Sequence, residues 1–133
     1  MIYCKKQNIE IMFDDENGSL YSLKENQTEY VKEKVDIFKL AFRNNIGKQI
    51  LLDSGNMSLI SSESSTTGFV CEYTASDVTV KINCDISDGI EWGVAVSPAK
   101  DLVCEWVKYP LIAVNNDFAD HGGNSKLLWG FNE

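Results

Sequence analysis

The side chains best suited to chemistry gather near the end of the chain, in the polar loop Asn115–Ser125. The loop contains Asp117, Asp120 and His121, and His121 is the only histidine in the sequence. Nucleophilic catalysis needs a base beside the nucleophile, so a Ser-His-Asp or Cys-His site would have to use this residue. No GxSxG motif accompanies it, and a histidine beside Asp and Gly is more often a turn or surface residue. We therefore predict that these three side chains bind a ligand and that the chain has no catalytic residue.

Aromatic side chains are the second feature with a chemical use. Several of them lie in the second half of the chain, among them Tyr73, Trp92, Trp106, Tyr109, Trp129 and Phe131. A sugar presents apolar C–H faces that stack on aromatic rings, and hydroxyls that need polar partners. The alternation of apolar residues assigns Trp92 and Trp106 to the core. Trp129 and Tyr109 join the three loop residues as predicted carbohydrate-binding residues.

Metal and cofactor sites are not indicated. Asp14–Asn17 offers oxygen ligands, but the spacing of an EF-hand is absent, and the segment is typical of a turn. The four cysteines (Cys4, Cys71, Cys84 and Cys104) form no CxxC pair, so we expect small buried side chains rather than a zinc site, with a disulfide left open. No GxGxxG or P-loop motif is present, and among the twenty acids no pair stands out as the carboxylates of a glycosidase. We predict no cofactor and no metal.

The charge of the chain bears on its partners. The net charge is −8, from twenty acidic and twelve basic residues, and the basic residues are scattered. Nucleic acid and anionic membranes need a positive surface, so neither is an expected partner. No stretch approaches the roughly 20 apolar residues of a membrane span. Lys5, Lys6 and Glu10 interrupt the segment where a secretory signal would be apolar, so we expect a cytoplasmic chain, or an extracellular one within a longer parent.

The elements that must position these residues are strands. A length of 133 residues fits a single domain. Ile9–Val31 alternates on both sides of an acidic Asn-Gly turn and predicts a β-hairpin. Val78–Ile86 is the clearest strand, because every even position in it is apolar. Further strands are predicted at Val35–Arg43, Gln49–Asp53, Gly68–Thr74, Ile90–Val96 and Leu102–Tyr109. Short strands at this spacing predict an all-β fold, an antiparallel β-sandwich with little helix.

Two details of this pattern can be tested directly. Ser54–Thr67 is rich in Ser, Thr and Gly, and is expected to be a loop around a weak strand at Met57–Ile60. Leu102–Tyr109 is apolar on both sides and is expected to be a central strand. Within it, Trp106 shares a side with Leu102 and Cys104 under strict alternation.

Three segments carry a resemblance to a known family. They are the hairpin Ile9–Tyr30 with its turn Asn17-Gly18-Ser19-Leu20, the stretch Trp106–Leu111 (WVKYPL), and the end Leu127–Glu133 (LLWGFNE). Together they resemble the N-terminal β-sandwich of large bacterial glycoside-hydrolase-like proteins. In those proteins a galactose-mutarotase-like supersandwich precedes a barrel that holds the catalytic acids.

The resemblance implies a non-catalytic accessory or carbohydrate-binding domain, residues 1–133 being an N-terminal fragment of a longer protein. Its partners would be carbohydrate and the downstream catalytic domain of the same parent. Mutarotases use catalytic His and Glu residues, and only His121 is present here, so the resemblance carries no catalytic residue over. Two other classes stay open. One is a stand-alone mutarotase-like sugar epimerase that uses His121, and the other is a protein-interaction module that associates through an edge strand.

Overall fold

The chain forms an antiparallel β-sandwich, as the sequence predicts. The computed structural model describes residues 1–114, and within them it contains strands, turns and no helix. It follows that residues 1–114 hold no helix able to cross a membrane. The strands are β1 (Ile2–Lys6), β2 (Ile9–Asp14), β3 (Ser19–Glu25), β4 (Thr28–Glu29), β5 (Val31–Glu33), β6 (Lys39–Asn44), β7 (Gln49–Asp53), β8 (Ser58–Ser65), β9 (Gly68–Ala75), β10 (Val78–Asp85), β11 (Glu91–Ser97), β12 (Leu102–Lys108) and β13 (Ala113–Val114).

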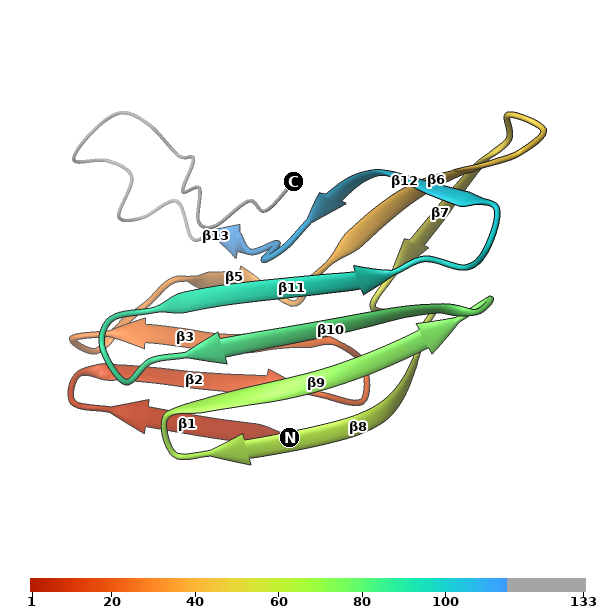
Figure 1. Cartoon of the computed structure of the whole chain (residues 1–133). Coiled ribbons are helices and arrows are strands. Elements are labelled where there is room, and N and C mark those ends of the chain that lie inside the picture. The colour runs from red at the N-terminus through yellow and green to blue at the C-terminus, as the bar shows by residue number, and fades with distance from the viewer. Residues whose placement is uncertain (115–133) are drawn as a thin grey trace.

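Two four-stranded sheets face each other and make up what we call the body. One has the order β1-β2-β3-β4 and the other the order β11-β10-β9-β8, and the two layers are visible in Figure 1. Phe13 of β2 stacks on Phe69 of β9 across the gap, with ring centroids 4.6 Å apart. The predicted hairpin is confirmed as β2 and β3, and it supplies Ile11, Phe13, Leu20 and Leu23 to the core.

The regular alternation of β10 explains the order of its sheet. Val78, Val80, Ile82 and Cys84 are buried, while Lys81 and Asp85 between and after them are exposed. β9 and β11 pair with β10 in unbroken register, so their inward residues meet the same core. Burial of such apolar faces is the main force that holds the two layers together.

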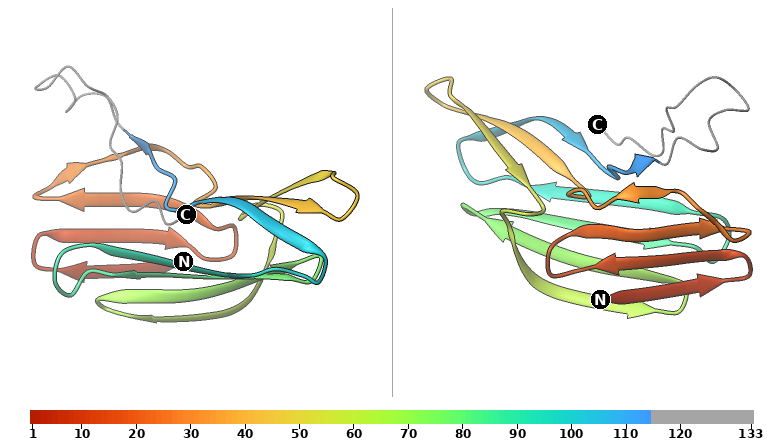
Figure 2. Two further views of the ribbon diagram at one scale, coloured as in Figure 1. Left: turned by 45° about the horizontal axis from the view of Figure 1, so that its top comes forward. Right: turned by 180° about the vertical axis from the view of Figure 1, so that it is seen from behind.

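A three-stranded sheet, β12-β6-β7, leaves the body at one end, and we call it the arm. Figure 2 shows the β6–β7 hairpin extending past the ends of the body strands. In this sheet β6 is the central strand and β12 lies at an edge. The expectation that Leu102–Tyr109 is central is therefore wrong: its two-sided apolar pattern reflects a β-bulge, described below.

The segment before the arm also differs from the prediction. The strand expected over Val35–Arg43 begins only at Lys39, because the backbone of the residues before it is used to join separate parts of the chain. The Ile37 N–H donates to the Gly18 carbonyl at 2.8 Å, and the Leu111 N–H donates to the Ile37 carbonyl at 2.8 Å. The residues Asp36–Phe38, which we call the crossing segment, thus link the body to the arm.

Two strands have weak signals in the sequence. Ser58–Ser65 is a full strand, β8, rather than a loop, although most of its residues are exposed. Its pairing with β9 holds it in place, which local composition does not show. β1 was not predicted, and it lies at the edge of its sheet against β2.

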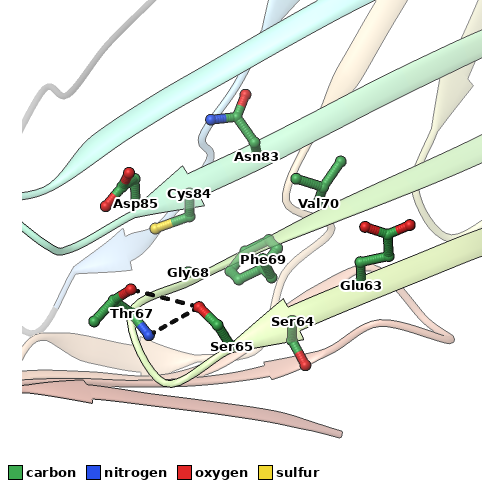
Figure 3. Close-up of a pocket in the computed structure, with 10 residues that line it drawn as sticks. All are labelled: Glu63, Ser64, Ser65, Thr67, Gly68, Phe69, Val70, Asn83, Cys84 and Asp85. Carbon is green, nitrogen blue, oxygen red and sulfur yellow. Dashed lines mark hydrogen bonds between the residues drawn. The ribbon is translucent and has the colours of Figure 1, made fainter.

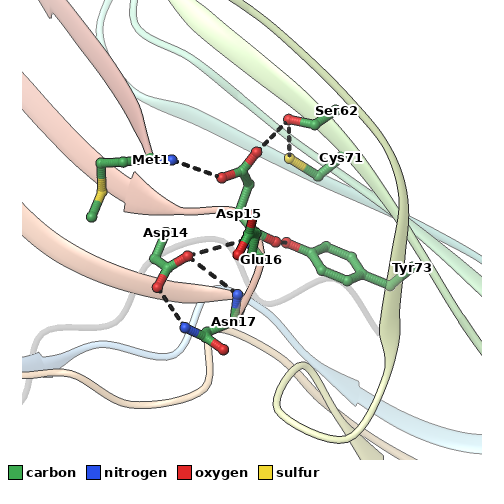
Figure 4. Close-up of polar contacts among 8 residues, drawn as sticks. All are labelled: Met1, Asp14, Asp15, Glu16, Asn17, Ser62, Cys71 and Tyr73. Carbon is green, nitrogen blue, oxygen red and sulfur yellow. Dashed lines mark hydrogen bonds and ion pairs between the residues drawn. The ribbon is translucent and has the colours of Figure 1, made fainter.

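The acidic turn Asp14–Asn17 ties the two sheets together (Figure 4). The Asp14 carboxylate accepts hydrogen bonds from the N–H groups of Glu16 and Asn17, which closes the turn. Asp15 accepts a hydrogen bond from the Ser62 hydroxyl at 2.8 Å, and its carbonyl accepts one from the Tyr73 hydroxyl at 2.6 Å. Both carboxylates thus have partners within the protein.

The cysteines are free, as the small buried residues that the sequence predicts. Cys4, Cys71 and Cys84 are buried and Cys104 is half-buried, with no disulfide among them. Burial raises the pKa of the Cys84 thiol, so this side chain is a poor nucleophile and acts as packing.

Candidate functional site

Four of the five predicted binding residues, Asp117, Asp120, His121 and Trp129, lie outside the described residues. The fifth, Tyr109, is fully buried. Its hydroxyl donates to the Asn83 carbonyl at 2.8 Å, and its ring meets Trp92 edge-on with centroids 5.7 Å apart. Burial raises the pKa of Tyr109 well above its ordinary value. In this structure the tyrosine is part of the core, with no surface for a ligand.

A bulge in β12 creates a different candidate. Val103 pairs with Arg43 and Cys104 with Phe42, but the register shifts before Trp106, which pairs with Ala41. Because paired residues in a sheet share a face, the shift places Trp106 on the side of Val103, away from Cys104. Trp106 is therefore not a core residue, and the assignment made from strict alternation is wrong. Val107 takes the inward place and is buried.

The outer face of the arm, which we call the arm face, has Trp106 at its centre. The middle row across the three strands is Trp106, Ala41 and Leu51. Ala41 is fully buried although it lies on this outer face, whereas Leu51 is 59% exposed. The Lys108 ammonium lies 4.9 Å from the centre of the half-buried Trp106 ring.

Polar side chains form the next row, toward the tip of the arm. Arg43 donates to both oxygens of Glu105, from Nε at 3.0 Å and from a terminal nitrogen at 3.2 Å. The Gln49 amide also donates to Glu105, at 3.3 Å. The hydrogen bond from Arg43 lowers the pKa of Glu105 despite some desolvation. This row offers a fixed carboxylate together with amide and guanidinium donors.

The base of the arm face carries a pair of acids beside a hollow. Lys39 pairs with Asp53 on β7 and with Lys108 on β12. A hollow of about 550 Å³ is lined by Val35, Asp36, Lys39 and Leu111–Ala113. Burial, followed by the charge and the hydrogen bond of Asp53, raises the pKa of the Asp36 carboxyl.

The arm face offers groups that can bind a polar ligand. Within residues 1–114 no group of three or more His, Cys, Asp or Glu side chains could hold a metal ion. What the arm face does offer is an aromatic ring between two rows of hydrogen-bonding groups.

A second hollow, of about 330 Å³, lies where β9 and β10 meet the β8–β9 turn (Figure 3). Glu63, Asn83 and Asp85 give it polar groups. Its aromatic residue, Phe69, is only 2% exposed and stacks on Phe13 in the core. Without an accessible ring, this hollow is less suited to a sugar than the arm face.

The arm-face residues were missed because their signal depends on the bulge. The alternation of Val35–Arg43 already places Lys39, Ala41 and Arg43 on one side of a strand. Nothing local in Leu102–Tyr109 shows that one extra residue turns Trp106 toward that same side. An aromatic residue in a strand that is apolar on both sides is the one signal that could have raised the question.

Comparisons with known proteins place no constraint on this site. No protein-family model, no curated protein and no solved structure matches the chain.

Proposed function

We propose that this chain is a non-catalytic, carbohydrate-binding β-sandwich, and that the arm face holds the sugar. The observation that carries the proposal is the display of Trp106 on an outer sheet face by the bulge in β12. A tryptophan on an outer sheet face offers an aromatic ring on which the apolar face of a sugar can stack.

The residues around Trp106 supply what a sugar needs. One face of a pyranose ring would stack on the indole ring of Trp106. The Lys108 ammonium, which lies 4.9 Å from the centre of that ring, would be close to the sugar. Sugar hydroxyls would then meet Glu105, Gln49 and Arg43, which hold one another in place before any ligand arrives. Groups held in this way lose little conformational freedom on binding.

The wider role follows from the resemblance described above and from the fold. An all-β sandwich is compatible with an accessory domain of a glycoside-hydrolase-like parent, in which a downstream domain supplies the catalytic acids. The arm face would then keep the catalytic domain close to a polysaccharide. Linked binding sites raise the effective concentration of the second partner without a new contact.

Isothermal titration with soluble oligosaccharides tests the proposal. The panel contains the hexasaccharides of β-1,4-linked glucose, xylose and mannose, and of α-1,4-linked glucose. We expect millimolar or tighter binding to one of them, which Trp106→Ala removes and Trp106→Phe partly retains. Tyr3→Ala is the matched control, because Tyr3 is 53% exposed but lies on β1 in the body.

Two results would overturn the proposal. One is a wild-type protein that binds none of these sugars at millimolar concentration. The other is a Trp106→Ala protein that binds as well as the wild type does, since the site would then lie elsewhere.

A further inference from the structure

The sheet β11-β10-β9-β8 ends at β11, whose outer edge has no partner strand among residues 1–114. β11 pairs with β10 along its whole length, and no backbone hydrogen bond joins it to another strand of the described chain. Figure 1 shows it as the last strand of its layer. Alternate residues of an edge strand direct their N–H and C=O groups away from the sheet. This row of groups, which we call the β11 edge, can therefore accept one more strand.

The β11 edge lacks the features that protect the other long edges of the molecule. β8 and β12 each contain a bulge, and β1 carries Lys5 and Lys6, with the Lys5 N–H bonded to the Thr66 carbonyl at 2.7 Å. β11 keeps an unbroken register and contains no Lys, Arg or Pro. β7 lacks these features too, but it has five residues against the seven of β11. Because bulges, lysines and prolines prevent edge-to-edge pairing, the β11 edge is the one best able to pair.

The core side of β11 is also incompletely covered. Three apolar residues of this strand pack against the core: Trp92, Val94 and Val96. Their partners on β10 are at most 2% exposed, whereas these three are only half-buried. A further strand at this edge would cover them, and the burial of apolar surface would favour its addition.

The order of residues in β11 is suited to a second copy of the same strand. Antiparallel pairing centred on Val94 gives all seven residues a partner: Glu91 with Ser97, Trp92 with Val96, Gly93 with Ala95, and Val94 with itself. Apolar residues then face apolar residues on the core side, and small residues face each other on the outer side. Parallel pairing in register would instead place Glu91 against Glu91, and two like charges directly opposite each other are destabilising.

The turns at the two ends of β11 favour the same antiparallel direction. The turn before the strand contains Asp88 and no basic residue, whereas the turn after it contains Lys100 and Asp101, whose charges cancel. Antiparallel pairing brings the acidic turn of one copy beside the neutral turn of the other. The two acidic turns are thereby kept at opposite ends of the pair.

We propose that the β11 edge binds a second copy of this chain, antiparallel about Val94, so that the two four-stranded sheets become one continuous sheet. The contact is isologous, since the same residues meet from both sides. Each copy carries a net charge of −8, so the copies repel, and the association is weak and strengthened by salt. The inference concerns the body and does not rest on the function proposed for the arm face.

Sedimentation equilibrium of the full chain tests the proposal. We expect the mass to rise with concentration from 14.9 kDa toward twice that value. The dissociation constant should be at least about threefold lower in 0.5 M than in 0.05 M salt. Val94→Lys, which places a charge at the centre of the pair, should stay monomeric. Val103→Lys is the matched control, because Val103 is 67% exposed on another edge strand, β12, and this variant should associate as the wild type does.

A cysteine pair decides the matter if Val94→Lys does not fold. In the proposed pair residue 94 faces its own copy with Cβ atoms about 4.5–5.5 Å apart, which a disulfide can bridge with a small adjustment. The two copies of residue 96 are offset by four residues, about 13 Å. Mild oxidation should therefore cross-link Val94→Cys into a dimer, while Val96→Cys should show no more dimer than the wild type on a non-reducing gel.

Three results would overturn the proposal. One is a wild-type mass of 14.9 kDa at every concentration in high salt; slow hydrogen exchange at consecutive β11 amides of that monomer would mean that the same chain covers the edge. The second is a folded Val94→Lys protein that associates as the wild type does, and the third is equal cross-linking of the two cysteine variants. A dimer that binds no sugar refutes the arm-face function alone, and a monomer that binds sugar refutes the pairing alone.

Discussion

The sheet of β9, β10 and β11 and the sheet of the arm each contain a tryptophan, and the two tryptophans lie on opposite kinds of face. Trp92 follows the unbroken register of β11, faces the core and meets Tyr109 edge-on. Trp106 follows a bulge in β12 and lies on the outer face. Other bulges have a similar consequence: the shifts in β3 and β8 leave Tyr21 and Ile60 exposed. Bulges are thus one way in which large side chains of this protein reach the surface.

The largest expected effect is a difference between the two tryptophans. Trp92→Ala should lower the free energy of unfolding by about 3 kcal/mol, because it leaves a cavity against Tyr109. Trp106→Ala should lower it by less than about 1 kcal/mol, since the ring is half-buried and lies on an outer sheet face. Urea denaturation followed by circular dichroism measures both. Equal losses would mean that Trp106 is a core residue and that the contrast does not exist.

A smaller effect is expected where the body meets the arm. Gly18 has a φ of +64°, and a Cβ there would overlap the Cβ of Ser54. We expect Gly18→Ala to cost at least about 2 kcal/mol, from backbone strain together with the displacement of Ser54. The matched control is Gly47→Ala at the tip of the arm, where φ is +84° but nothing lies within 4 Å. The control should cost about 1 kcal/mol from strain alone, and a cost equal to that of Gly18→Ala would mean that the joint is not tightly packed.

The smallest change in stability is expected in the polar row of the arm face. Arg43→Lys keeps the charge but loses the two parallel hydrogen bonds to Glu105. Because both side chains are partly exposed, the melting temperature should stay within about 1 °C of the wild-type value. Sugar affinity should nevertheless fall several-fold, because Glu105 is no longer held in place. Unchanged affinity would remove this row from the proposed site.

The sequence was informative about the fold and much less so about the site. Alternation and turn signals placed β2, β3, β7, β9, β10 and β11, most clearly β10, whose buried face follows a period of two. It failed at β8, where pairing with β9 overrides a composition typical of loops, and at the crossing segment, where the backbone bonds to distant residues. It failed for Trp106 because a one-residue shift reverses the face of every residue after it.

The charged residues of the candidate site also could not be paired from the sequence alone. Lys39 and Asp53 are separated by the whole β6–β7 hairpin, and only the antiparallel return of β7 pairs them. Glu105 and Arg43 are 62 positions apart, and they meet through the register of β12 on β6. Such pairs cannot be recognised before the sheet order is known.

A protein that keeps Trp106 as its only tryptophan, through Trp92→Phe and Trp129→Phe, gives the most direct test of the account. Its fluorescence reports the surroundings of the arm face alone. The account predicts emission typical of a partly hydrated indole, quenching by acrylamide, and protection from that quenching when the bound oligosaccharide is added. Blue-shifted emission that neither acrylamide nor any sugar of the panel changes would place Trp106 in the core and contradict the account.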